Sequence, residues 1–215
     1  MTGLWTRWWQ QAPEPGAAAR WLVLDVESSG LDPTHDRLLA IAAVAVQVGE
    51  GAPRIVLADS FEAVLAQPHE TAAPDKANIL VHGIGVAAQG RGDDPAAVLE
   101  RFEAFVGAAP LVGFHVAFDR TLIDRAMHAV LGRRLAVPWL DLAELAPVLH
   151  PVPGAHALDD WLQACGIPCL QRHQAAADTL ATAELLLRLL PAARAEGARD
   201  LRGLQRLAAR RRWLP

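Results

Sequence analysis

The first residues able to do chemistry are two carboxylates near the end of an apolar run. Asp25 and Glu27 flank Val26, and because side chains alternate along a strand, both carboxylates point to the same face. Carboxylates held side by side repel each other, so either one is protonated or a cation lies between them. Such hard oxygen ligands suit Mg²⁺ or Mn²⁺. Two solvated acids in the following loop are the more common outcome for such a tripeptide alone.

Two further segments carry acidic and histidine side chains. Asp119 ends the segment Gly-Phe-His-Val-Ala-Phe-Asp, where a predicted strand gives way to a helix, and it is either a helix cap or a further ligand. His173 and Asp178 are five residues apart, which on a helix separates their side chains by about 140°. They share a site only if His173 lies in the loop before the helix and reaches back. Otherwise they are an exposed histidine and a first-turn aspartate.

The elements that must position these residues begin with three predicted strands at 21–26, 38–48 and 55–65. The short links between these strands favour an antiparallel meander. Asp94 and Pro95 then mark the start of a helix that ends at Gly107. The remaining predicted elements are a short helix at 73–81, a strand at 111–115, a helix at 119–131, a strand at 136–140 and helices at 156–165 and 175–190. The pattern therefore predicts an α/β domain with a mixed five-stranded sheet, in which a three-stranded antiparallel meander precedes strands that alternate with helices.

Length and composition limit the class of protein. With 215 residues, 52% of them hydrophobic and 20% charged, the chain is expected to form one globular domain with short extensions. A net charge of −4 argues against a protein that binds nucleic acid only by neutralising its phosphates. Bound metal ions would, however, reverse the sign of the charge near an acidic site. No uncharged apolar run reaches the roughly 20 residues of a membrane span, and residues 1–20 lack the apolar core of a signal peptide. We therefore expect a soluble, cytoplasmic protein with no membrane contact.

The two ends of the chain differ in composition from the middle. Residues 1–20 form a Trp-rich appendage, either a helix packed on the domain or a segment that docks a partner. The tail at 194–215 is rich in arginine, and the spacing of Leu201, Leu204 and Leu207 predicts a packed amphipathic helix, with a nucleic-acid or partner contact as the alternative. The domain that carries the chemistry is then 21–193.

Taken in order, the acidic motifs resemble those of a known family. Asp-x-Glu on the first strand, Phe-Asp at a helix start and His-x₄-Asp entering the last core helix are similar to the motifs of DEDD exonucleases. These belong to the DnaQ-like superfamily, which includes the proofreading epsilon subunit of bacterial DNA polymerase III. Three weaker segments also match: Ser28-Ser29-Gly30-Leu31, Val81-His82-Gly83-Ile84 and Leu140-Asp141-Leu142. Because the chain has no tyrosine, His173 indicates the histidine branch, DEDDh.

The resemblance, which covers roughly residues 20–190, implies a ribonuclease H-like fold and a metal-dependent 3′-to-5′ exonuclease. Asp25, Glu27, Asp119 and Asp178 would hold two divalent ions, Mg²⁺ or Mn²⁺, about 4 Å apart, and His173 would be the general base. The expected substrate is the 3′ end of single-stranded DNA, and the expected product is a nucleoside 5′-monophosphate. Residues expected to line the pocket for the terminal nucleotide, by stacking that suits any base, are Val26, Ser28, Leu31, His82, Phe114, His115 and Phe118.

Other interpretations remain open at the level of sequence. Phe114-His115 stands where many family members have His-Asn, so the contacts of that asparagine are not carried over. The short Arg-rich end favours a stand-alone exonuclease, or the exonuclease part of an accessory system, over the replicative proofreader, with a replication or repair protein as a candidate partner. The same chemistry acting on RNA or short oligonucleotides is one alternative. A non-catalytic docking module is the other.

Overall fold

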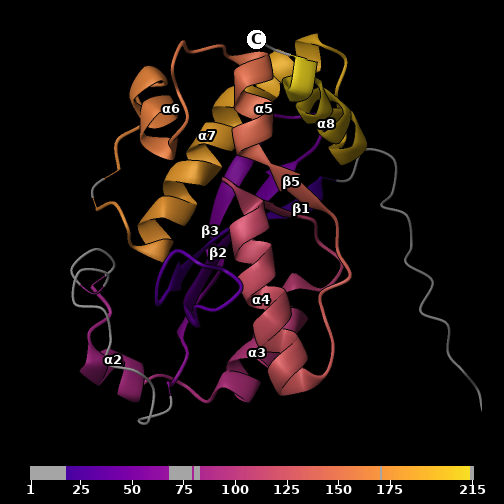
Figure 1. The fold of residues 1–215 in the computed structure, drawn as a ribbon. Coiled ribbons are helices and arrows are strands. Elements are labelled where there is room, and N and C mark those ends of the chain that lie inside the picture. Colours follow the sequence, from indigo (N-terminus) through magenta and orange to yellow (C-terminus); the bar gives the residue numbers. More distant parts are fainter. Residues whose placement is uncertain (1–17, 68–78, 80–82, 170, 214–215) are drawn as a thin grey trace, which may run out of the picture.

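A computed structural model describes residues 18–67, 79, 83–169 and 171–213 of the chain. Its centre is a five-stranded sheet of order β3-β2-β1-β4-β5 (Figure 1). β1 (Ala19–Ser28), β2 (Leu38–Val48) and β3 (Arg54–Val64) form an antiparallel meander. β4 (Leu111–Gly113) pairs in parallel with β1, and β5 (Trp139–Asp141) pairs in parallel with β4. The predicted mixed sheet is therefore confirmed.

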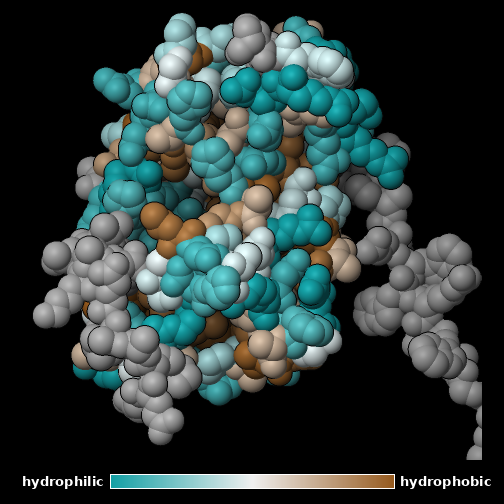
Figure 2. Space-filling view, in the orientation of Figure 1, coloured by the Kyte–Doolittle hydropathy of each residue, from teal (hydrophilic) through white to brown (hydrophobic). Residues whose placement is uncertain are grey.

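Helices cover both faces of this sheet, which explains why the middle of β1 and nearly all of β2 are apolar. One face packs against α3 (Pro95–Val106) and α4 (Val116–Leu131). The other face packs against α5 (Leu142–Leu149), α6 (Leu158–Ala164), α7 (Ala175–Ala195) and α8 (Leu201–Ala208). Figure 2, in the same orientation as Figure 1, shows hydrophilic residues over most of the visible face, with apolar residues in the hollows between them.

Alternation along β1 decides which helices its carboxylates meet. Leu22 and Leu24 belong to the core under α3 and α4, whereas Trp21 and Val23 belong to the core under α7. Continuing this alternation places Asp25 and Glu27 on the α7 side of the sheet. The strand therefore delivers two acids to the place where α7 begins.

Several boundaries differ from those that the pattern predicts. α4 starts at Val116, immediately after the left-handed turn at His115, and not at Asp119. Val130, whose apolar position on α4 predicts burial, is 44% exposed. α2 (Val86–Gly90) and α5 are additional helices, and α5 follows β5 without a linker because Asp141 both ends the strand and caps the helix. Most of the helix predicted at 73–81 lies outside the described residues.

The C-terminal segment packs onto the domain. Leu204 and Leu207 of α8 are buried in the core under α7, and Leu201 is partly buried against it. The segment ends in a short 3₁₀ helix, Ala209–Trp213. Within the described part of the chain, no helix has the length and apolar character needed to cross a membrane. Nearly all of the Trp-rich appendage, residues 1–17, falls outside the described residues.

Candidate active site

The structure brings the four acidic residues of the sequence motifs into one pocket of about 500 Å³. Asp25 and Glu27 come from the end of β1, Asp119 from the first turn of α4 and Asp178 from the first turn of α7. Asp119 and Asp178 are each only 5% exposed. His173 lines the same pocket. Residues far apart in the sequence thus meet where a strand ends and two helices begin.

Asp119 is not the cap of its helix. The N-cap position of α4 is His115, whose side chain makes no capping hydrogen bond, and Asp119 lies inside the first turn. His115 has φ +61°, and its backbone N–H donates to Asp141 Oδ1 at 2.9 Å. A Cβ at Gly113 would lie 3.0 Å from the Val116 side chain and 3.2 Å from a β1 carbonyl. The glycine therefore lets α4 begin close to β1, which directs Asp119 into the pocket.

His173 lies in the loop before α7, as the interpretation of a shared site requires. It has φ +61°, and its backbone N–H donates to Asp178 Oδ2 at 3.0 Å. This bond folds the loop back over the first turn of α7, because donor and acceptor are five residues apart. The histidine and the aspartate consequently face one pocket despite their helical phase.

The residues expected to bind the terminal nucleotide occupy the same pocket, with one exception. Val26, Ser28, Leu31, Phe114, His115 and Phe118 all line it. His82 lies outside the described residues. Leu31 is 90% exposed at the pocket, and the Phe114 and His115 rings meet edge to face with centroids 4.8 Å apart. The pocket therefore offers apolar and aromatic surface beside its acidic floor.

Burial, and in second place neighbouring carboxylates, disfavour the charged form of the acids in this pocket. Burial, followed by repulsion from Asp119, Glu27 and Asp178, raises the pKa of Asp25 well above its usual value. Burial and then repulsion from Asp178 raise the pKa of Glu27 to about 8. Burial, with a smaller contribution from Asp141, raises the pKa of Asp119 to about 7. The pocket thus holds more acidic groups than its surroundings can keep ionised, which is the electrostatic condition for binding cations.

The carboxylate oxygens of the pocket suit hard divalent cations, although the described residues are not close enough together to bind one as they stand. Glu27 Oε1 is buried and has no hydrogen-bond partner, so one carboxylate oxygen of the pocket remains unsatisfied. Carboxylate oxygens are the ligands that Mg²⁺ and Mn²⁺ prefer. Across the described ranges, however, no three Asp, Glu, His or Cys side chains converge closely enough to hold an ion. The chemistry of the ligands is present, and the carboxylates must approach one another further to bind a metal.

Sequence reasoning missed a basic residue in this pocket. The guanidinium of Arg172 hydrogen-bonds to Asp178 and to Asp159 of α6. Asp159 is 13 positions away, and no spacing rule connects an arginine in a loop to an acid in the preceding helix. His156, Ala157 and Leu158, at the start of α6, also line the pocket.

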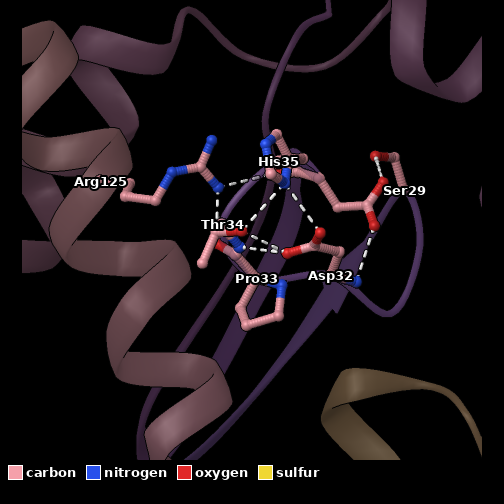
Figure 3. Close-up of polar contacts among 7 residues, drawn as sticks. Ser29, Asp32, Pro33, Thr34, His35 and Arg125 are labelled. Carbon is pink, nitrogen blue, oxygen red and sulfur yellow. Dashed lines mark hydrogen bonds and ion pairs between the residues drawn. The ribbon is translucent and has the colours of Figure 1, made fainter.

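The loop between β1 and β2, residues 29–37, is held by a polar network (Figure 3). The Asp36 carboxylate accepts from Ser29 Oγ and from the Asp32 backbone N–H, each at 2.8 Å. Arg125 of α4 donates to the carbonyl oxygens of Pro33 at 2.6 Å and of Asp36 at 2.9 Å. The loop that presents Leu31 to the pocket is therefore fixed both internally and to the helix that carries Asp119.

We expect Gly30→Ala to loosen this loop and weaken substrate binding. A Cβ at Gly30 would lie 2.4 Å from Asp36 Oδ2, so the carboxylate must rotate away and give up its bonds to Ser29 and Asp32. The loss should lower the free energy of unfolding by about 1 to 2 kcal/mol. In an oligonucleotide hydrolysis assay it should raise KM more than it lowers kcat. Gly51→Ala is the control, because a Cβ there meets nothing within 4 Å; equal effects from both variants would contradict the expectation.

We further expect the metal-free protein to lose stability as pH rises from about 5 to 8. Across this window folded Glu27 and Asp119, with pKa values of about 8 and 7, retain protons that the unfolded chain, with values of 4.5 and 3.8, has released. The folded state then binds more protons, so the free energy of unfolding falls with rising pH. Thermal melting in EDTA at several pH values measures this, and Mn²⁺ should flatten the decline. A melting temperature that rises through this window would contradict the raised pKa values.

Comparison with known proteins supports the resemblance. The sequence model of the RNase_T family, described as "Exonuclease", matches residues 22–186. The chain is 35% identical over 179 residues to a DNA polymerase III subunit epsilon-like protein of Rhodobacter capsulatus, covering 82% of this chain and 24% of that protein. It is 33% identical over 179 residues to the PolC-type DNA polymerase III of Bacillus subtilis, covering 82% of this chain and 12% of that protein. The chain thus spans a quarter or less of the length of these relatives.

A solved structure shares the fold. E. coli Exonuclease I in complex with a dT13 oligonucleotide superposes with a TM-score of 0.67 and 20% sequence identity, over 79% of this chain and 40% of that one. At this identity the likeness concerns the fold, which agrees with the mixed five-stranded sheet described above. Because the family match covers well over half of its residues, from the first buried strand to the last core helix, the chain belongs to the RNase_T exonuclease family.

Proposed function

We propose that this protein is a metal-dependent 3′-to-5′ exonuclease that removes nucleoside 5′-monophosphates from the 3′ ends of single-stranded DNA. The observation that carries the proposal is the meeting of Asp25, Glu27, Asp119, Asp178 and His173 in one pocket of an exonuclease-family chain. A structural role alone explains neither the buried, mutually repelling carboxylates nor the unpartnered oxygen of Glu27.

The side chains of the pocket have separate roles in the proposed reaction. The four carboxylates would hold two divalent cations, which when bound lower the pKa of a water and offset charge on the attacking and leaving oxygens. His173 accepts the proton of the attacking water through its imidazole. The backbone N–H of the same residue fixes Asp178, so base and ligand are held together. The 3′ oxygen leaves with the shortened strand, and the phosphate stays on the released nucleotide.

The preference for an unpaired end is inferred from the pocket wall. Phe114, Phe118 and the exposed Leu31 provide surfaces on which a terminal base stacks, and stacking is tolerant of base identity. The structural relative named above was solved in complex with a dT13 oligonucleotide, which supports a DNA strand as the substrate class here. The epsilon-like and PolC-type relatives support a replication or repair protein as partner.

A 5′-labelled single-stranded DNA oligomer, incubated with Mg²⁺, with Mn²⁺ or with EDTA, tests the proposal. We expect a metal-dependent ladder that shortens from the 3′ end, with nucleoside 5′-monophosphates as the released product. A matched RNA oligomer in parallel identifies the alternative substrate. Cleavage of neither polymer with either ion would overturn the proposed activity and favour a docking role.

A further inference from the structure

Arg172 occupies an unusual position for a fixed positive charge. Among the described residues that line the acidic pocket, it is the only lysine or arginine. Its Nε donates to Asp159 Oδ1 and its Nη1 donates to Asp178 Oδ1. The side chain of Asp178 is 7% exposed, whereas that of Asp159 is 58% exposed. One guanidinium thus joins a buried ligand candidate to a carboxylate at the surface.

The contacts leave Asp178 little freedom to bind anything else. Its Oδ2 accepts the backbone N–H of His173 at 3.0 Å. Its Oδ1 accepts from Arg172 and, at 3.6 Å, from the Cys169 thiol. The positive charge of Arg172 also opposes the raised pKa values of Asp25 and Glu27. In the described structure the guanidinium therefore supplies part of the positive charge that a divalent cation would bring.

We propose that Arg172 is a resident counter-ion that a divalent cation must displace from Asp178, and that it then binds a phosphate of the substrate. Since arginine stays charged at all working pH values, it leaves Asp178 by moving and not by losing a proton. Its bond to Asp159 remains as a tether, so the released Nη donors stay in the pocket. A guanidinium fork is suited to phosphate oxygens. The inference rests on the proposed function, because the cation and the phosphate are those of the exonuclease reaction.

Two consequences follow from this exchange. While Arg172 holds Asp178, it competes with the metal and weakens metal binding. Once the metal has bound, Arg172 strengthens substrate binding. An arginine with only a structural role would produce neither effect, because its removal would not tighten the binding of metal.

The first experiment titrates Mn²⁺ into wild type, Arg172→Gln and the control Arg101→Gln by calorimetry and by thermal melting. Arg101 pairs with Asp93 at the surface, so its replacement removes the same charge away from the pocket. We expect Arg172→Gln to bind Mn²⁺ about tenfold more tightly than wild type, and to melt lower than wild type only without metal. Arg101→Gln should match wild type. If Arg172→Gln binds no more tightly, the counter-ion role is overturned.

A second variant and a kinetic measurement complete the test. If circular dichroism shows that Arg172→Gln does not fold, Arg172→Lys replaces it. Lysine keeps the positive charge but lacks the two-pronged guanidinium, and we expect its Mn²⁺ affinity to exceed that of wild type.

At saturating Mn²⁺, loss of the phosphate contact should raise KM for an oligonucleotide severalfold with a smaller change in kcat. An unchanged KM would overturn the phosphate contact. Wild-type protein that binds no Mn²⁺ would instead overturn the metal dependence of the proposed function.

Discussion

Asp25→Asn should abolish hydrolysis while raising the melting temperature of the metal-free protein. Burial, together with repulsion from the three other carboxylates of the pocket, raises the pKa of Asp25. A neutral amide of the same shape removes both the cost of burying a charge and that repulsion, so the folded state gains stability. The same change removes a proposed metal ligand, and we expect the rate to fall by about 10³-fold or more. Activity and stability therefore change in opposite directions.

Asp59→Asn is the matched control for this substitution. Asp59 pairs with Arg20 at 2.7 Å on the edge strand β3, and that arginine lowers the pKa of Asp59. Its negative charge is therefore stabilising, and the amide should lower stability slightly without changing the hydrolysis rate. Oligonucleotide hydrolysis with Mn²⁺ and thermal melting in EDTA give both readouts. An Asp25→Asn protein that retained full activity would contradict the metal assignment, and one that melted lower would contradict the repulsion.

His173→Asn should lower the hydrolysis rate by about 10² to 10⁴-fold with little change in Mn²⁺ affinity. Asparagine is chosen because it tolerates the left-handed backbone at this position, where φ is +61°. The hydrogen bond from the backbone N–H of residue 173 to Asp178 survives the substitution, so the proposed metal ligand keeps its orientation. Loss of rate with retained metal binding is then the result expected for a general base.

The exposed His150, which ends α5 outside the pocket, provides the comparison. His150→Asn should hydrolyse oligonucleotides at the wild-type rate. Single-turnover hydrolysis and Mn²⁺ calorimetry measure both quantities on the same preparations. If His173→Asn keeps its rate, the base is another group, and if it loses Mn²⁺ binding, His173 acts on the metal site and not on the water.

Local periodicity was enough to predict the sheet and to place the acids on it. The period of two along β1 separates Asp25 and Glu27 from the residues that face α3 and α4, and the short links determine the meander. That the segments near 25, 119 and 173 would meet was implied by the resemblance of the ordered motifs to those of DEDD exonucleases. The strands and the shared face of Asp25 and Glu27 depend on neighbours in the chain, which is why one sequence reveals them.

Features that depend on tertiary contacts could not be predicted from local sequence patterns. The pairing of Arg172 with Asp159 and Asp178 exists only because the loop after α6 returns to the start of α7. The early start of α4 depends on the close approach of Gly113 to β1. The Asp141 carboxylate accepts the backbone N–H of His115 and also caps α5. Because α5 therefore follows β5 without a linker, the sequence contains no loop that would have indicated a new helix.

Two of the three histidines that line the pocket among the described residues share a backbone property with consequences for engineering. Among the described residues, His115 and His173 are the two non-glycine positions with positive φ. Such conformations cost free energy that glycine would not, so glycine at either place should relax the chain. It would also remove a side chain from the pocket. Thermostabilisation of this protein thus meets a stability–activity trade-off at these two positions, and libraries built for heat resistance should keep both histidines.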